Sequence, residues 1–275
     1  GNNLKQMSLA TINCADTYQQ LLPPGSGNYP LPMVSPNNGY GSPFFFMLPF
    51  IEQQNLYNAT YQPAGAQNAW GKSTPNWGQP SYGAYWGNLR GNIKTYICPT
   101  DPTNTPKEFP SSLPGGGTYG AISYAANEQI FSLTANGGWE SYKRYPASIT
   151  DGTSNTIFCA ERMLNCQANG GGLGGSAYWY SFQAFATEVW VPSGPSWYPL
   201  FSPMPIATCG GQCPKGWPCP DSSVANIGAP STYHTGGLTV GMGDGSVRNV
   251  SQGISLTTWL AAVTPAGGEV LGPDW

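Results

Sequence analysis

The sequence has little charge. Asp, Glu, Lys and Arg together make up 8% of the 275 residues, against about 25% in an average soluble domain. The 10 Lys and Arg residues are scattered singly, and the formal net charge is −3. Binding a phosphate backbone requires basic side chains gathered on one face. The missing basic cluster therefore argues against a nucleic-acid partner.

Long apolar runs and a second histidine are also absent. No run approaches the roughly 18 apolar residues that cross a bilayer. His234 is the only histidine, so a Ser-His-Asp or Cys-His catalytic site would have to be built around it. The nucleophile motif G-x-S-x-G does not occur, and GGGLGG (170–175) lacks the Lys and Ser or Thr of a phosphate loop. We therefore expect a protein that is not an enzyme.

Glycine and proline are abundant instead, with 37 and 27 residues. Both interrupt helices and set turns, which favours a loop-rich chain with short strands. Hydrophobic residues make up 40% of the chain and aromatic residues 13%, which suffices for a core and argues against disorder. We expect one decorated domain over residues 1–275.

Cysteine is frequent for a cytosolic protein, with 7 residues. Cys209, Cys213 and Cys219 cluster in TCGGQCPKGWPCP with the spacing C-x3-C-x5-C. A structural zinc site would need four ligands, typically in C-x2-C pairs. Disulfides across a surface loop are therefore favoured over zinc, with Cys166 as a further candidate. The odd count leaves one thiol free or paired with a partner outside this sequence, and the expected location is outside the cytoplasm.

Apolar periodicity predicts a helix over residues 2–22, because apolar positions recur at steps of three and four. The positions on this face are Leu4, Met7, Thr11, Cys14, Tyr18 and Leu21, of which Thr11 is polar and weakens the stripe. Residues 23–25, Pro-Pro-Gly, are expected to end this helix. It has no obvious N-cap close to residue 1, so we expect the helix to start upstream.

The remaining pattern predicts short elements separated by long loops. Helices are predicted at 49–58 and at 255–263 with Ser255 as cap, strands at 93–98, 119–127, 155–161 and 177–191, and a hairpin of 237–242 and 246–251 around Gly243-Asp244-Gly245. Residues 59–92 and 192–232 are loop-rich insertions. The predicted fold is α+β: a long N-terminal helix packed on an antiparallel β-sheet, with large loop-rich insertions.

Asp151 in TDGTSN and Asp244 in the hairpin turn offer oxygen ligands for calcium. The spacing of an EF-hand is absent, and Asp-Gly forms tight turns without an ion. Turn formation is therefore the favoured interpretation, calcium the alternative, and no other cofactor is expected. No metal-type ligand stands beside His234 in the sequence. We interpret its imidazole as a donor to a nearby carbonyl or carboxylate that joins the hairpin to its neighbour.

The insertion at 59–92 is rich in aromatic residues. Their rings suit sugar faces and subunit interfaces alike. Packing of irregular loops is the favoured interpretation, and contact with a glycan or another extracellular ligand is the alternative. The candidates for such contact are Trp70, Trp77, Tyr85 and Trp86.

Several sequence blocks, taken in order, resemble a bacterial family of unknown function whose members look like prepilins. The blocks are NNLKQMSLA, DTYQQLLPP, FFFMLPFIEQQNLYN, YICPTDP, SYAAN, ITDGTSNTIFCAE and the closing TTWLAAVTPAGGEVLG. That family takes its name from a His, nine residues and then Asp-Gly. His234, residues 235–243 and Asp244-Gly245 match this spacing.

The resemblance implies a pilin-like fold, with residues 1–22 as the soluble half of a spine helix. It also implies an upstream type IV pilin-like segment that anchors the protein in the membrane, and hence a place at the cell envelope or its extracellular face. The implied partners are other pilin-like subunits or components of a type II secretion system. His234, Asp244 and Gly245 are expected to hold the terminal hairpin in shape. The expected function is a non-enzymatic structural subunit, with a surface glycan- or ligand-binding module as the alternative.

Overall fold

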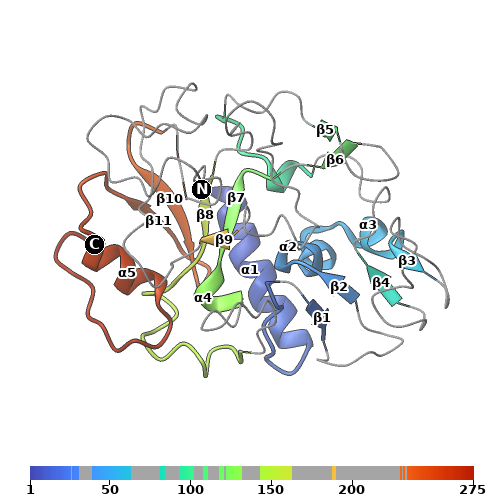
Figure 1. Ribbon diagram of the computed structural model, residues 1–275, viewed down its shortest axis with the longest axis horizontal. Helices are drawn as coiled ribbons and strands as arrows, with labels where there is room; N and C mark the ends of the chain where they lie inside the picture. Colours follow the sequence, from blue (N-terminus) through green and yellow to red (C-terminus); the bar gives the residue numbers. More distant parts are fainter. Residues whose placement is uncertain are drawn as a thin grey trace, which may run out of the picture.

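The computed structural model describes a part of the chain that is α+β (Figure 1). The described residues are 1–25, 27–30, 39–62, 81–83, 93–101, 108–110, 118–120, 122–131, 143–162, 188–189, 230, 232 and 234–275. Most of the two predicted insertions, 59–92 and 192–232, lies outside them.

A five-stranded sheet lies at the centre of the described fold. Its strands follow the order β11 (Val247–Val250), β10 (Leu238–Met242), β8 (Ile157–Glu161), β7 (Tyr124–Asn127) and β9 (Glu188–Val189). Neighbouring strands from β11 to β7 are antiparallel, and β9 is parallel to β7. Every residue of β7 and β8 is buried. Strands buried throughout need cover on both faces of the sheet.

The helix α1 (Asn2–Thr17) covers one face of this sheet and contacts β10 and β8. Its buried side chains include Leu4, Met7, Ala10 and Cys14. The predicted end at residue 22 is wrong. Gln19 and Gln20 adopt left-handed φ angles of 55° and 63°, and Leu21 forms a β-bridge with Arg144. The helix therefore stops before the two prolines, at a turn that joins the chain to residues 143–145.

The helix α5 (Leu256–Val263) belongs to a second core on the opposite side of the sheet. Figure 1 shows α1 and α5 separated by the strands. Ser255 caps α5 by accepting the Thr258 N–H at 3.3 Å, as predicted. Trp259 is fully buried in this core, which also contains Val240 of β10. The order helix, sheet, helix follows from these two separate apolar clusters.

Aromatic residues extend the α1 core away from the sheet. They lie on the short helices α2 (Pro43–Phe46) and η1 (Leu48–Ile51), which are followed by α3 (Gln54–Asn58). The predicted helix at 49–58 is therefore broken in two, because Glu52 adopts a left-handed φ of 63°. Beside these helices lies a four-stranded sheet of β1 (Gly27–Tyr29), β2 (Gly39–Gly41), β4 (Ser81–Gly83) and β3 (Tyr61–Gln62), in that order.

Of the other predicted strands, some are present in the structure and others are replaced or divided. Residues 93–98 contain the 3-10 helix η2 (Lys94–Tyr96) where a strand was predicted. The predicted strand 119–127 is divided between β6 (Thr118–Gly120), which pairs with β5 (Glu108–Pro110), and β7, which leads into α4 (Glu128–Phe131). Strand 155–161 and the terminal hairpin are confirmed as β8, β10 and β11. In the stretch 177–191, the described part is β9 alone.

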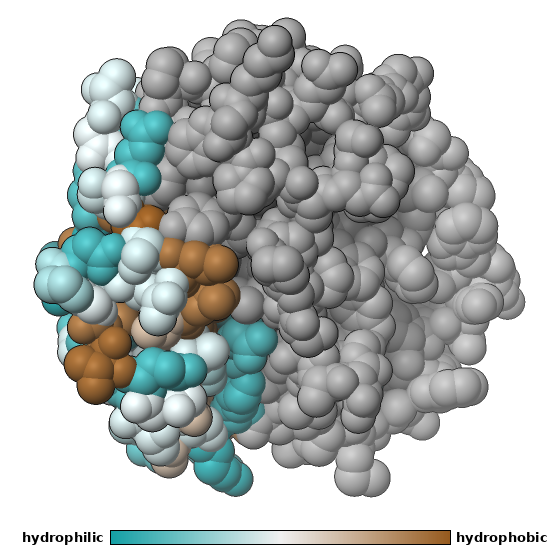
Figure 2. All heavy atoms as spheres, turned by 60° about the vertical axis from the view of Figure 1, so that its left-hand side comes forward, coloured by the Kyte–Doolittle hydropathy of each residue, from teal (hydrophilic) through white to brown (hydrophobic). Residues whose placement is uncertain are grey.

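Within the described residues, no helix combines the length and the apolar composition of a membrane span. Figure 2 shows the face that carries the C-terminal elements, where hydrophilic and near-neutral residues surround smaller apolar areas. This face has no continuous apolar band among its described residues.

Candidate functional site

His234 and the Asp-Gly pair lie at opposite ends of β10. His234 precedes the strand, whereas Asp244 and Gly245 form the turn that follows it. The strand between them has five residues, and at about 3.3 Å per residue it is about 16 Å long. The nine-residue spacing therefore corresponds to one strand with its flanking turns, and the imidazole and the Asp244 carboxylate do not form one site.

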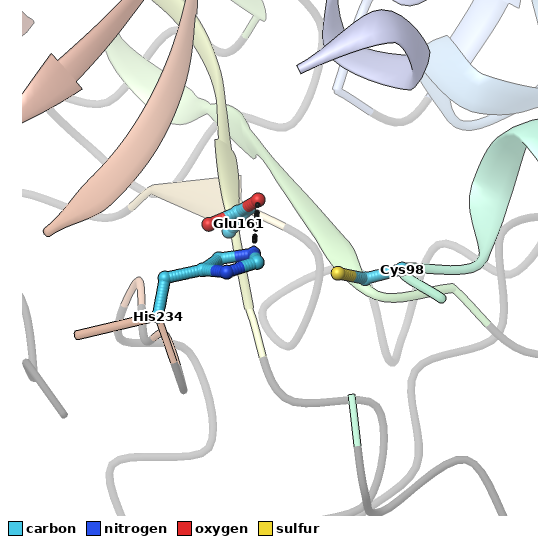
Figure 3. Close-up of side chains that lie close together, drawn as sticks. All are labelled: Cys98, Glu161 and His234. Atoms are coloured by element: carbon cyan, nitrogen blue, oxygen red, sulfur yellow. Dashed lines mark ion pairs between the residues drawn. The ribbon is translucent and has the colours of Figure 1, made fainter. Parts of the chain in front are cut away.

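The imidazole of His234 meets two residues that stand far from it in the sequence. Its Nε2 lies 3.3 Å from Oε1 of Glu161 and 3.1 Å from Oγ1 of Thr100. The thiol of Cys98 lies beside them, and its Sγ is 3.2 Å from the same Thr100 hydroxyl. One ligand atom from each of Cys98, Glu161 and His234 lies within 4.8 Å of the other two, as Figure 3 shows. We call these three residues the His234 cluster. Cys98 and Glu161 are metal-type ligands that the fold brings to His234, although neither stands beside it in the sequence.

Glu161 is the last residue of β8, and its carboxylate is held in one orientation. Oε2 accepts hydrogen bonds from the Thr232 hydroxyl and from the Thr239 N–H, both at 3.1 Å. The other oxygen, Oε1, is the one that faces His234. The carboxylate is nearly buried, with 5% of the side chain exposed. Its direction is therefore fixed by β10 and by the segment that leads into it.

The backbone at His234 is fixed by the same threonine. The Thr232 hydroxyl accepts the His234 N–H at 3.1 Å while it donates to Glu161. The His234 carbonyl accepts the Gly237 N–H at 3.4 Å and closes a turn before β10. The imidazole itself is 37% exposed. It thus reaches from solvent toward a buried carboxylate.

Cys98 stands in the segment 93–101, which is tied to the start of β7 and of α1. Its carbonyl accepts the Asp101 N–H at 3.2 Å, and the Asp101 carboxylate accepts the Ser123 hydroxyl at 3.1 Å. The Asn3 amide of α1 donates to the Ile97 carbonyl at 2.9 Å. These contacts hold the thiol at the end of the sheet where β8 finishes.

The other described cysteines differ from Cys98. Cys14 and Cys159 are completely buried in the core, and burial raises the pKa of each thiol to about 12. Both are therefore neutral thiols at physiological pH. Cys14, Cys98 and Cys159 are all free, so the expectation of one free thiol is wrong. The disulfide candidates Cys166, Cys209, Cys213 and Cys219 lie outside the described residues.

The two calcium candidates use their carboxylates on nearby backbone groups. Asp151 accepts the Gly267 N–H at 2.8 Å and the Gly268 N–H at 3.0 Å, which fastens the C-terminal segment. Asp244 accepts the Ser246 N–H at 2.9 Å within its own turn. The Asp244 contact is the local turn contact that the favoured interpretation describes. The Asp151 carboxylate instead bonds to backbone groups that are distant in the sequence. The aromatic candidates Trp70, Trp77, Tyr85 and Trp86 lie outside the described residues.

The geometry of the His234 cluster differs from that of a catalytic triad. In a triad, the imidazole stands between nucleophile and carboxylate and uses a different ring nitrogen for each. Here the single nitrogen Nε2 faces Glu161, and it also faces the Thr100 hydroxyl that contacts Cys98. The groups converge on one point and do not form a relay.

Sequence reasoning missed Cys98 and Glu161 as neighbours of His234. Each is a single residue in a different block, YICPTDP and ITDGTSNTIFCAE. One usable signal was present: Glu161 places an acidic side chain at the end of an otherwise apolar strand, where a buried charge needs a partner.

Comparison with known proteins gives one match. Residues 1–257 match the protein family described as "Protein of unknown function (DUF1559)". No curated protein and no solved structure matches the chain. The matched range includes α1, the central sheet and all three residues of the His234 cluster.

Proposed function

Because this chain belongs to the DUF1559 family, whose function is unknown, we propose its role from its own architecture. It is a non-enzymatic structural subunit of the cell envelope, similar to a pilin or pseudopilin. The observation that carries this proposal is the two-sided character of α1. One side packs on the sheet, and the other forms an exposed stripe with opposite charges at its two ends.

The packed side of α1 approaches the sheet closely. A Cβ placed on Gly241 of β10 would lie 2.5 Å from the Ser8 Oγ and 3.2 Å from the Leu4 carbonyl oxygen. Small residues at this crossing let the backbones of helix and strand approach each other. In the proposal, α1 is a spine to which the sheet is fixed, so a force or contact on the helix is transmitted to the whole head.

The outer side of α1 is a stripe of exposed residues. The stripe comprises Asn2, Lys5, Leu9, Asn13 and Asp16. Lys5 and Asp16 are eleven residues apart, which places them on the same side of the helix and about 16 Å apart along it. Neither is in an ion pair with another described residue. Leu9 lies between them with 40% of its surface exposed.

Such a stripe suits contact between neighbouring helices. A second subunit shifted along the helix axis brings its Asp16 to Lys5 of the first, and the exposed Leu9 becomes covered between them. In this proposal the partners are further copies or other pilin-like subunits. An apolar segment joined to α1 anchors the assembly in the membrane, where packed helices associate through close contact. The mixed polar face in Figure 2 then faces water.

A charge exchange on α1 tests the proposal. We expect Lys5→Glu or Asp16→Lys to reduce cross-linked oligomers of the full-length protein in its native cells, because like charges then face each other. The double variant Lys5→Glu/Asp16→Lys should restore them, because it restores opposite charges. The measurement is the yield of chemically cross-linked species by immunoblot.

Glu52→Lys serves as the matched control. It makes the same charge change as Asp16→Lys at an exposed position away from α1, and it should leave the oligomers unchanged. Single variants that assemble like the parent protein, or a folded double variant that is no better than the singles, would refute the proposed contact.

A further inference from the structure

We infer that the His234 cluster binds a divalent transition metal of the zinc class, with Cys98, Glu161 and His234 as its protein ligands. Thiolate, imidazole and carboxylate are the three side-chain types that coordinate zinc in proteins. This inference is independent of the proposed subunit role.

The spacing of the ligand atoms fits a tetrahedral metal. Two atoms bonded to zinc at about 2.0–2.1 Å lie about 3.3 Å apart in that geometry. Nε2 of His234 and Oε1 of Glu161 are 3.3 Å apart. Sγ of Cys98 lies within 4.8 Å of both, and its side chain points toward them in Figure 3. To coordinate the metal, the Cys98 Sγ would have to move closer to the other two ligand atoms. Cys98 stands on a loop and is therefore less constrained by the sheet than Glu161.

The hydrogen bonds around Glu161 prepare it to act through one oxygen. Oε2 is occupied by the Thr232 hydroxyl and the Thr239 N–H. Oε1 stays directed at the point that His234 also faces. Outer groups of this kind orient the ligands of a metal and strengthen its binding. Thr232 also accepts the His234 backbone N–H, so a single hydroxyl positions two of the three ligands.

Charge balance also favours a divalent cation here. Cys98 and Glu161 are buried, and a buried carboxylate beside a thiolate is costly without positive charge nearby. One divalent ion with these two anionic ligands and a neutral imidazole gives a centre without net charge. Three protein ligands leave one position of a tetrahedral metal for water or an external ligand. The 37% exposure of His234 places the cluster within reach of solvent.

Zinc titration of the reduced, metal-free chain tests the inference. Isothermal calorimetry should detect one tight equivalent. We expect His234→Gln and Cys98→Ala each to raise the zinc dissociation constant by about 100-fold or more. Loss of a group that only orients a ligand already lowers metal affinity by about 10–100-fold, and loss of a ligand should cost at least as much. Cobalt should give a thiolate-to-metal charge-transfer band that disappears in Cys98→Ala. Circular dichroism of the metal-free variants verifies that they fold. If Cys98→Ala does not fold, His234→Gln decides the test, because His234 is partly exposed and its replacement disturbs the core less.

A second set of thiols provides the control. Cys209, Cys213 and Cys219 form a separate group in the sequence, and a variant with serine at all three should keep the tight equivalent. The inference is overturned if the parent chain binds no zinc. It is equally overturned if folded His234→Gln keeps the equivalent while the triple-serine variant loses it.

Discussion

Asp244 and Gly245 act within the hairpin turn that they form. The Asp244 carboxylate accepts the Ser246 N–H, and Gly245 has a left-handed φ of 85°. A Cβ at Gly245 would also lie 2.8 Å from Cδ2 of Leu9 on α1. A glycine is thus required twice, by the turn and by the helix beneath it.

Replacing Asp244 separates this turn role from an ion-binding role. We expect Asp244→Ala to lower the free energy of unfolding by about 0.5–2 kcal/mol, the scale of a lost local side-chain hydrogen bond. Asp244→Asn keeps an oxygen acceptor and should unfold at nearly the same urea concentration as the parent chain. The turn role would be contradicted if Asp244→Asn clearly lowered the free energy of unfolding and the melting temperature of the parent chain depended on calcium.

At this scale, local chemistry was predictable from the sequence and remote contacts were not. The Asp-Gly turn follows from two adjacent residues, and so does the Ser255 cap of α5. The partners of His234 come from two other segments, at positions 98 and 161. No periodicity links them, because their meeting depends on how β8 and β10 pair.

Among the elements, the crossing of α1 over β10 is the contact that fixes the helix on the sheet. Gly241 lies under Ser8 and the Leu4 carbonyl, with no room for a side chain. The same glycine adjoins the place where the pairing of β10 with β8 shifts register. The close approach of α1 and the register shift of β10 therefore occur at the same glycine.

A methyl group at this crossing should therefore be costly. We expect Gly241→Ala to lower the free energy of unfolding by about 1–3 kcal/mol, the usual cost of overpacking a core, as measured by urea denaturation. Gly253→Ala is the control, since its nearest neighbour would be the Ser251 Oγ at 3.8 Å. Equal effects of the two substitutions would show that the close approach is not the cause.

Elements with strong local signals were predicted correctly, and elements shaped by tertiary packing were not. The hairpin and α5 carry their own turn and cap. Residues 93–98 contain the β-branched and aromatic residues that are typical of a strand, but Tyr96 is buried and its hydroxyl donates to the Phe44 carbonyl at 2.6 Å. That contact with α2 holds the segment as a 3-10 turn over the aromatic core.

For the whole molecule, the α+β class was predictable because apolar periods of both kinds occur along the chain. The order of the layers was only partly predictable from the sequence. Two separate cores, one under α1 and one under α5, cover opposite faces of the sheet. The N-terminal helix was predicted to pack on the sheet, whereas the role of α5 as the second cover depends on the position of the whole hairpin.

The central claim is that α1 is a spine whose outer stripe meets other subunits. Site-specific photo-cross-linking from α1 in the native envelope measures this directly. A photoreactive residue at the exposed Asn13 should cross-link to a second copy or to another pilin-like subunit. The same probe at Val270, which is 90% exposed, should not capture that partner. An Asn13 probe that captures no subunit, in cells where the protein is present and folded, would contradict the account.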